Sequence, residues 1–328
     1  MVFSENKTDC IVVGAGLSGL VLARRLTAAG YRVLILEKSK AVGGRIATRR
    51  DGPATYDHGA QFYKLSSREP WPLDTDWAGK GLSHVWFQDQ NSVFKNAPSG
   101  MTVLVKELAQ GLQIVFEQKV TSIQEMMVSG LQFESLQVEC ESGAKYESKF
   151  VFISSPLPQS RDLLKSSGIA YPVELNKIDY ASALVGLFEV ESENLNIRNL
   201  KYMQDVNEEM FSVSNQLSKK TSSTLAFAVV MQPQWSQQHF LLEDDSNLAK
   251  ISYAFTDYLR NFSLDVSVKK SQLKKWRYSH PLSTYSSPHL VLGAQQNIYL
   301  VGDAFGGPSL RGAADSADSI DVGTLKHK

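Results

Sequence analysis

The N-terminal part of the chain alternates between short apolar runs and a stretch with helical periodicity. The runs "CIVV" at 10–13 and "RVLILE" at 32–37 have the length and composition of buried strands. Between them, four apolar side chains recur near helical spacing: Leu17, Leu20, Val21 and Leu26. Gly30 is typical of a helix end. The pattern predicts a strand, a glycine turn, a helix and a second strand in immediate succession.

The later patterns predict two kinds of structure. A helix is expected within 98–112, and strands are expected at Val115, 119–123, 149–159 and 298–302. From about 180 to 280, alternating apolar and polar positions predict an antiparallel sheet, with one helical segment at 247–262. A final helix is expected to begin near Gly312, with small residues on one face and acids on the other.

Composition narrows the class of protein. The chain has 328 residues, of which 43% are hydrophobic and 21% charged, which is ordinary for a globular protein. Lys+Arg and Asp+Glu are both 34, so no overall field attracts nucleic acid or an anionic membrane. No apolar run reaches the roughly 18 residues of a membrane span, and "MVFSENKTDC" lacks the basic start of a signal peptide. Cys10 and Cys140 are the only cysteines, so we expect buried free thiols and a cytoplasmic setting.

The glycine turn "GAGLSG" at 14–19 indicates a dinucleotide site. Gly14 permits the tight turn, Gly16 lets backbone approach a pyrophosphate, and Gly19 lets the helix pack closely on the strand. The helix N-terminus offers free N–H groups to phosphates. Glu37, at the end of the second strand, can accept hydrogen bonds from ribose hydroxyls and would repel a 2′-phosphate. The alternative is that the glycines only shape a turn.

Two further stretches extend this prediction. In "EKSKAVGGRIATRR" at 37–50, Gly43 and Gly44 allow backbone to lie against a ligand, and Arg45 adds a cation beside it. Arg49 and Arg50 are left open between a contact to the dinucleotide or substrate and a solvated loop.

The stretch "YDHGAQFYK" at 56–64 carries several candidate side chains. Gly59 and Ala60 allow close approach, and Gln61 can hydrogen-bond a ring edge or a substrate amide. Phe62 and Tyr63 offer flat surfaces, and the alternative is an ordinary strand start. His58 is a candidate base, although such a histidine is more often a satisfied polar residue.

The C-terminal part carries two more motifs. In "NIYLVGDAFGG" at 297–307, a strand delivers Asp303 to a turn that Gly302 keeps open, and the acid can accept hydrogen bonds from hydroxyls. In "WRYSHP" at 276–281, Trp276 and Tyr278 share one side of a strand with His280. This row is either the wall of a pocket for a flat substrate or part of an aromatic core. The lysine pairs 269–270 and 274–275 are expected to be solvated.

Together these stretches resemble renalase-like flavoproteins, especially the bacterial members, within the flavin amine oxidase superfamily. "GAGLSG", "GGRIATRR", "DHGAQFY", "SSPLPQ", "WRYSHP" and "GDAFGG" occur in this order over nearly the whole chain. The resemblance implies an α/β fold, α+β overall, with a Rossmann-type FAD-binding domain and an inserted antiparallel-sheet substrate domain. We expect the FAD-binding domain at 1–65, 96–160 and 285–328, and the substrate domain at 66–95 and 161–284.

The resemblance also implies an activity. It is the oxidation of mis-reduced isomers of nicotinamide dinucleotides, with hydride passing to FAD and electrons to oxygen, giving hydrogen peroxide. FAD is expected to be non-covalent, because no cysteine lies near the flavin ring. The partners are then a small-molecule substrate and oxygen, with no nucleic acid, membrane or metal. An amine oxidase or desaturase of the same fold, and a non-catalytic FAD-binding protein, remain as alternatives.

The candidate residues fall into two sets. The candidate catalytic residues are Gln61, Tyr63, Trp276, Tyr278 and His280. The candidate cofactor-binding residues are Gly14, Gly16, Leu17, Ser18, Gly19, Glu37, Lys38, Gly44, Arg45, His58, Gly59, Ala60, Gln61, Val120, Gly302, Asp303, Gly312 and Ala313. Val120 comes from the resemblance, in which backbone near such a valine contacts adenine. Gly312 and Ala313 would place the positive end of a helix beside the flavin pyrimidine.

Overall fold

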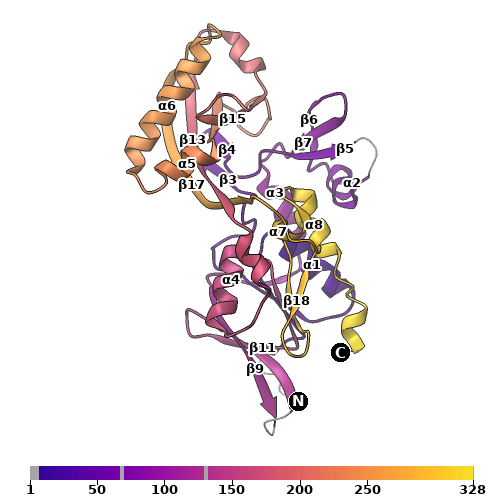
Figure 1. Ribbon diagram of the computed structural model, residues 1–328. Coiled ribbons are helices and arrows are strands. Elements are labelled where there is room, and N and C mark those ends of the chain that lie inside the picture. The colour runs from indigo at the N-terminus through magenta and orange to yellow at the C-terminus, as the bar shows by residue number, and fades with distance from the viewer. Residues whose placement is uncertain (1–6, 67–69, 129–131, 328) are drawn as a thin grey trace. The chain divides into compact units, whose positions relative to one another are not determined.

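A computed structural model describes residues 7–66, 70–128 and 132–327 (Figure 1). Residues 1–6 belong to the segment in which we expected no signal peptide, and they lie outside this description. The chain forms two compact units, each assembled from separate segments. Unit 1 consists of 1–44, 105–180 and 280–328, and unit 2 consists of 45–104 and 181–279.

Unit 1 is built on a six-stranded sheet in the order β18-β19-β12-β1-β2-β8. The strands are β1 (Cys10–Val13), β2 (Val33–Leu36), β8 (Gln113–Val115), β12 (Phe150–Ile153), β18 (Leu290–Leu292) and β19 (Ile298–Leu300). They pair in parallel, except for the antiparallel pair of β18 and β19. The apolar runs were predicted as buried strands, and β1, β2 and β12 are buried at every position. This is the Rossmann-type sheet expected from the sequence.

Helices and a second sheet complete unit 1. The helices are α1 (Leu17–Ala28), α4 (Leu157–Ser166), α7 (Asp303–Gly306), α8 (Leu310–Asp318), and the short 3-10 turns η1 (Val173–Lys177) and η3 (Thr324–His327). The helix α3 (Thr102–Ala109) begins in a segment of unit 2 and ends in a segment of unit 1. The second sheet has the order β11-β10-β9, from β9 (Val120–Val128), β10 (Gln132–Cys140) and β11 (Lys145–Ser148).

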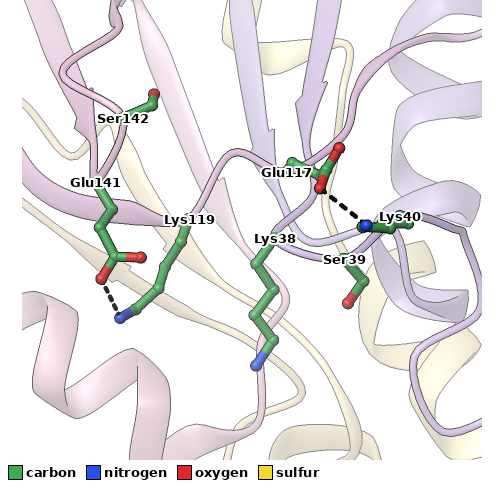
Figure 2. Close-up of a pocket in the computed structure, with 7 residues that line it drawn as sticks. All are labelled: Lys38, Ser39, Lys40, Glu117, Lys119, Glu141 and Ser142. Atoms are coloured by element: carbon green, nitrogen blue, oxygen red, sulfur yellow. Dashed lines mark hydrogen bonds and ion pairs between the residues drawn. The ribbon is translucent and has the colours of Figure 1, made fainter.

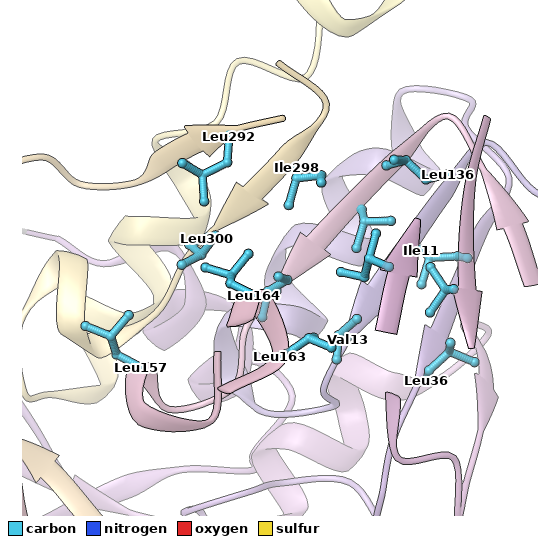
Figure 3. Close-up of a cluster of buried hydrophobic side chains, with 14 of the residues drawn as sticks. Ile11, Val13, Leu36, Leu136, Leu157, Leu163, Leu164, Leu292, Ile298 and Leu300 are labelled. Atoms are coloured by element: carbon cyan, nitrogen blue, oxygen red, sulfur yellow. The ribbon is translucent and has the colours of Figure 1, made fainter. Parts of the chain in front are cut away.

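One apolar core holds unit 1 together (Figure 3). Ile11 and Leu36 of the parallel sheet lie in it with Leu136 of the second sheet and Leu164 of α4. All four are at most 1% exposed. Full burial of such a side chain stabilises the fold by about 1.5–3 kcal/mol. Both sheets are therefore tied to α4 by the same core.

Unit 2 is built on a sheet in the order β14-β15-β16-β13-β17. Its strands are β13 (Tyr180–Glu191), β14 (Tyr202–Gln204), β15 (Met210–Asn215), β16 (Ala226–Met231) and β17 (Ser267–Pro281). Two smaller sheets join β3 (Thr48–Asp51) to β4 (Ala54–Asp57), and β5 (Tyr63–Ser66) to β7 (Ser92–Asn96) and β6 (His84–Gln88). The helices are α2 (Pro72–Gly79), α5 (Pro233–His239), α6 (Asp244–Arg260) and the 3-10 turn η2 (Leu195–Asn199). The pairings among β13 to β16 are antiparallel, as the alternating pattern predicted.

The helix α6 lies along the large sheet of unit 2 (Figure 1). Ile251, Phe255 and Leu259 of this helix are fully buried and pack against Phe188 and Phe227. Their spacing of four residues places them on one helix face. This is the helix that the periodicity of 247–262 predicted.

The segmentation differs from our expectation in detail. Residues 45–65 and 96–104 belong to unit 2, and 161–180 belong to unit 1. The reason lies in the cores: Ala54 and Tyr56 of β4 are buried with Leu187 and Ala228 of the large sheet. Conversely, Leu164 of α4 is buried in the core of unit 1.

The expectations for the two cysteines and for membrane spans can be compared with the structure. Cys10 and Cys140 are both buried and unpaired, and burial raises the pKa of the Cys140 thiol to about 11. Within residues 7–66, 70–128 and 132–327, no helix has the length and apolarity needed to cross a membrane.

Candidate functional site: an acid-anchored glycine turn

The turn between β1 and α1 has one glycine that faces free space. A Cβ on Gly19 would lie 2.2 Å from the carbonyl oxygen of Gly14, so the helix packs this closely only with glycine. Gly14 itself has a φ of 104°, which other residues rarely adopt. A Cβ on Gly16, in contrast, would have no atom within 4 Å. Gly16 also caps α1 without a side-chain hydrogen bond, so the amides of Leu17 and Ser18 keep their capacity for an anion.

Glu37 is fixed beside this turn by backbone amides. Its Oε2 accepts from Ala15 N at 2.7 Å, and its Oε1 accepts from Ser39 N at 2.8 Å. The residue is 7% exposed. A carboxylate has about four acceptor positions, so about two remain for hydroxyl groups of a ligand. The acid is thus oriented by the fold and still able to bind.

Gly43 and Gly44 lie against the glycine turn between β1 and α1. Gly43 N donates to Ala15 O at 2.9 Å, and Gly43 forms an isolated bridge with Gly16. Gly44 has a φ of 55°, and a Cβ there would lie 3.6 Å from the Cα of Gly16. The two glycine motifs therefore form one continuous backbone surface at the end of β1, without side chains that would cover it.

Lys38, the residue after Glu37, lines a hollow on unit 1 (Figure 2). The hollow has a volume of about 560 Å³, and its lining residues are Lys38, Ser39, Lys40, Glu117, Lys119, Glu141 and Ser142. Its lysines are engaged: Lys119 pairs with Glu141 at 2.7 Å, and Lys38 donates to Gln159 at 3.0 Å. Val120 follows Lys119 at the start of β9 and packs at the edge of the core.

The C-terminal motifs lie in the same unit. Asp303 is 7% exposed, begins α7, and accepts from the Tyr180 hydroxyl at 2.8 Å. Gly302 has a φ of 135°. Ser18 of α1 donates through its hydroxyl to Ala313 O at 2.7 Å, which ties the start of α1 to α8. Ser18 is therefore available to a ligand through its backbone amide rather than through its side chain.

Gly312 serves the packing of α7 against α8. A Cβ on Gly312 would lie 2.3 Å from the Gly306 carbonyl oxygen, and a Cβ on Gly306 would lie 1.8 Å from the Gly312 carbonyl oxygen. The start of α8 is capped by the Ser309 hydroxyl, which accepts from Gly312 N at 2.9 Å. The predicted helix begins at Leu310, slightly before Gly312.

Unit 2 contains a buried ion pair that sequence analysis missed. Lys219 Nζ donates to Asp57 Oδ2 at 2.7 Å, and both side chains are 0% exposed. The other carboxylate oxygen of Asp57 accepts from Thr48 Oγ1 at 2.6 Å and from Met101 N at 2.8 Å. Burial lowers the pKa of Lys219, and the charge of Asp57 opposes that shift.

Gln61 belongs to the network around this pair. Its Nε2 donates to the carbonyl oxygens of Asp57 at 2.6 Å and Gly59 at 3.1 Å. Its Oε1 accepts from Ser214 at 2.8 Å, Gln216 at 3.1 Å and Lys219 at 3.3 Å. The amide that we expected to hold a substrate is thus fully engaged inside unit 2. Its geometry suits it to fixing the stretch 57–61.

Two further candidate residues of the stretch 58–63, Tyr63 and His58, differ in exposure. Tyr63 is 3% exposed; its hydroxyl donates to Asp74 at 2.7 Å, and its ring packs on Trp71 and Trp77. His58 is half-buried and stacks on Trp276 with ring centroids 5.4 Å apart and planes at 20°. Burial first, and then the charge of Lys274, lower the pKa of His58 to about 4.

Trp276 is held on both sides. Its indole Nε1 donates to the His58 carbonyl oxygen at 2.7 Å, and its ring packs on the cluster around Tyr56. Tyr278 and His280 follow on β17 and are half-buried. Close to them, Arg45 Nη1 donates to Ser279 O at 3.2 Å. Arg45 O in turn accepts from Ala60 N at 3.0 Å and would lie 1.9 Å from a Cβ on Gly59.

Comparison with known proteins supports the N-terminal assignment. Residues 12–72 match the family model of an NAD(P)-binding Rossmann-like domain. Over 48 residues the chain is 50% identical to an L-amino-acid oxidase of Echis ocellatus, covering 15% of this chain and 10% of that protein. Over 92 residues it is 36% identical to a 4,4'-diapophytoene desaturase (4,4'-diaponeurosporene-forming) of Staphylococcus haemolyticus, covering 25% and 18%. The chain therefore matches less than a fifth of the length of either relative.

The fold has a match over nearly the whole chain. The crystal structure of the "Putative protoporphyrinogen oxidase" from Exiguobacterium sp. 255-15 superimposes with a TM-score of 0.74 at 13% identity, covering 99% of this chain and 100% of that one. At this identity the likeness concerns the fold: a parallel Rossmann-type sheet with separate antiparallel sheets. The sequence matches thus cover short stretches of the chain, whereas the fold match extends over nearly all of it.

Proposed function

We propose that the chain is an FAD-dependent oxidase of dihydronicotinamide compounds, and that unit 1 binds FAD non-covalently. The acid-anchored glycine turn carries the proposal. Gly16 opens on free space, the first-turn amides of α1 lack a side-chain cap, and Glu37 keeps acceptor positions. These features fit the pyrophosphate and ribose of a dinucleotide.

Within unit 1 the residues have separate tasks. The amides of Leu17 and Ser18 would bind the pyrophosphate, and Glu37 would accept from the ribose hydroxyls of the adenosine half. Asp303, oriented by the hydroxyl of Tyr180, has acceptor capacity for the ribityl hydroxyls. Arg45, Gly59 and Ala60 are proposed to serve the flavin from the resemblance alone.

The proposed reaction balances as a two-electron oxidation. When bound, FAD would supply a hydride acceptor that dioxygen reoxidises: the substrate loses a hydride, and dioxygen gains the two electrons and the proton of that hydride and one proton from solvent, which gives hydrogen peroxide. Such a transfer requires alignment of flat rings rather than a strong acid or base. That requirement agrees with His58, a neutral imidazole whose pKa of about 4 follows from its burial, and with a Trp276 ring held in one orientation by its own hydrogen bond.

The substrate test is anaerobic reduction of the bound flavin, followed by peroxide release in air. The 2- and 6-dihydro isomers of NAD are compared with ordinary NADH and with primary amines. We expect rapid reduction by the dihydro isomers. Trp276→Phe should lower turnover far more than it lowers FAD content, whereas Trp235→Phe, a buried tryptophan in the other core of unit 2, should spare turnover.

Oxidation of an amine is the second candidate. The matched relatives include an L-amino-acid oxidase, and unit 2 contains a fully buried lysine, Lys219, which uses two of its three donors on Asp57 and Gln61. Rapid flavin reduction by amines together with no reduction by the dihydro isomers would replace the first proposal with this one. No reduction by either class would leave a non-catalytic FAD-binding protein.

A further inference from the structure

Three successive carbonyl oxygens, at the end of β4 and directly after it, accept hydrogen bonds from side chains. Gln61 Nε2 donates to the carbonyl oxygens of Asp57 at 2.6 Å and Gly59 at 3.1 Å. The carbonyl oxygen between them, that of His58, accepts from Trp276 Nε1 at 2.7 Å. Because each peptide unit is a rigid plane, bonds to the units on either side leave the His58 carbonyl group little freedom of direction. The hydrogen bond that orients the Trp276 ring therefore depends on Gln61.

The side-chain amide of Gln61 is itself oriented by three donors within unit 2. Its Oε1 accepts hydrogen bonds from Ser214 at 2.8 Å, Gln216 at 3.1 Å and Lys219 at 3.3 Å. An amide turned by about 180° would place its NH2 group against the ammonium of Lys219 and its oxygen against two carbonyl oxygens, so those bonds would be lost. Gln61 is 8% exposed, and a buried amide without its partners is costly. The donors therefore fix which way Gln61 faces.

Lys219 is the charged member of these three donors, and it joins Gln61 to Asp57. Its Nζ donates to Asp57 Oδ2 at 2.7 Å as well as to Gln61, so one ammonium group holds both ends of this stretch. The same Nζ lies 5.5 Å from the centre of the Trp86 ring. The backbone of the lysine is held too, because its carbonyl oxygen accepts from Asn96 Nδ2 at 2.9 Å. Lys219 is thus fixed at its side chain and at its backbone.

The stacked rings of His58 and Trp276 lie at the end of this chain of contacts, with centroids 5.4 Å apart and planes at 20°. We infer that Lys219 is a positioning residue for this stack, acting through Gln61 and the carbonyl oxygen of His58. The inference deepens the proposed function and rests on it, because Trp276 is the ring assigned there to turnover. Hydride transfer between flat rings depends on alignment, so a residue that fixes the direction of this ring controls the rate through alignment.

The test measures how firmly the Trp276 indole is held. The purified full chain is labelled with ¹⁵N at its five tryptophans, and each indole signal is assigned with a Trp→Phe variant. In Lys219→Met, the Trp276 indole N–H should exchange with solvent about tenfold faster or more, because its bond to His58 opens more often. The indole of Trp235, which lies in the other core of unit 2, is the internal reference.

Two further variants keep the test decisive if Lys219→Met folds poorly. Gln61→Met leaves the ion pair of Lys219 and Asp57 in place and should give the same faster exchange. Phe255→Leu weakens the other core of unit 2 and should change the exchange of the Trp276 indole by less than about twofold. An unchanged Trp276 signal in Gln61→Met, or equal acceleration in Phe255→Leu, would overturn the inference.

A double variant, Asp57→Asn with Lys219→Met, separates position from stability. It removes both buried charges, so it should be more stable than Lys219→Met alone, but it still lacks the contact from Lys219 to Gln61. The Trp276 indole should therefore still exchange about tenfold faster than in the wild type. If slow exchange returns together with stability, the lysine acts only by stabilising the core, and the inference is wrong.

Turnover gives an independent readout, with whichever substrate reduces the flavin. Lys219→Met and Trp276→Phe should each lower kcat, and the combined variant should be no slower than Trp276→Phe alone, because both changes remove the same alignment. Losses that multiply in the combined variant would contradict this. The exchange measurement requires neither flavin nor turnover, so it can succeed or fail separately from the proposed oxidase activity.

Discussion

The two units each contain a buried acid at the end of a strand, Glu37 after β2 and Asp57 as the last residue of β4, and the two acids differ in their partners. Glu37 is held by two backbone amides, from Ala15 and Ser39, and keeps acceptor positions. Asp57 is closed in by a lysine, a hydroxyl and an amide, with both it and Lys219 fully buried. Glu37 is therefore oriented for a ligand, whereas the carboxylate oxygens of Asp57 are occupied by partners from its own unit.

The difference follows from where the partners come from. The partners of Glu37 lie within 22 residues along the chain, on the same strand–turn–helix motif. The lysine that pairs with Asp57 is 162 residues away. A local motif can orient an acid and still leave one side open to solvent. A long-range ion pair joins segments of a core, and desolvation makes any unpaired member costly.

Removing the lysine should have the largest effect. Lys219→Met leaves the Asp57 carboxylate buried without its counter-charge, and we expect a loss of about 3–5 kcal/mol in the free energy of unfolding. Urea denaturation followed by fluorescence measures it. Lys220→Met alters the exposed neighbouring lysine and should cost little.

The double variant sharpens this result. Asp57→Asn combined with Lys219→Met removes both charges, so it should be more stable than Lys219→Met alone. Strictly additive losses in this cycle would show that the two side chains do not act as a pair, and the contrast with Glu37 would fail.

A pH dependence should follow from His58, next to Asp57. Burial lowers its pKa from 6.5 to about 4, so between these values the unfolded chain binds a proton that the folded chain does not. Its contribution is complete above pH 6.5 and is lost as the pH falls, by about 3 kcal/mol at pH 4. His58→Gln should flatten the stability profile by this amount.

The control for this measurement is the variant itself at high pH. Burial also lowers the pKa of His84 and His289. The wild type and His58→Gln therefore share the loss of stability at low pH that these two histidines cause. Only the difference between the two profiles reports on His58. Parallel profiles from pH 8 to pH 4 would show that His58 titrates normally in the fold.

Replacement of Glu37, the acid that keeps acceptor positions for a ligand, should affect ligand binding more than folding. Glu37→Gln removes a charge-assisted acceptor, worth about 1.5–3 kcal/mol, so FAD should bind about tenfold to a hundredfold more weakly. Reconstitution of the apoprotein with FAD, followed by flavin fluorescence, measures the affinity. Glu117→Gln changes an exposed acid on the rim of the neighbouring hollow and serves as the control. Wild-type FAD affinity in Glu37→Gln would remove the main support for the proposed site.

The contrast also explains what the sequence could predict. The order of β1, α1 and β2, the roles of Gly14 and Gly19, and the position of Glu37 were all accessible, because local periodicity and turn chemistry determine them. The alternating runs likewise predicted the antiparallel sheet of unit 2. These features depend on neighbours along the chain.

Contacts between distant segments were not accessible. Lys219 carries no local signal of burial, since lysines are mostly exposed. Gln61 was predicted to hydrogen-bond a ring edge or a substrate amide, and its partners Ser214 and Gln216 could not be foreseen because they lie more than 150 residues away. In the same way, the expectation that Lys274 is solvated followed from its type alone, whereas Lys274 is half-buried on β17.

The smallest effect is expected at the rim of the hollow next to Glu37. Lys119 and Glu141 are 58% and 65% exposed, so their ion pair is screened by water and salt (Figure 2). Lys119→Gln should change the free energy of unfolding by less than about 0.5 kcal/mol and the affinity for FAD by less than about twofold. Both are measured as for Glu37→Gln. If FAD instead binds about tenfold more weakly, and the loss disappears at high salt, a phosphate of the cofactor contacts Lys119. The ligand-binding surface would then extend from Glu37 across the hollow, and Glu37 would be one part of a larger site that also contains lysines.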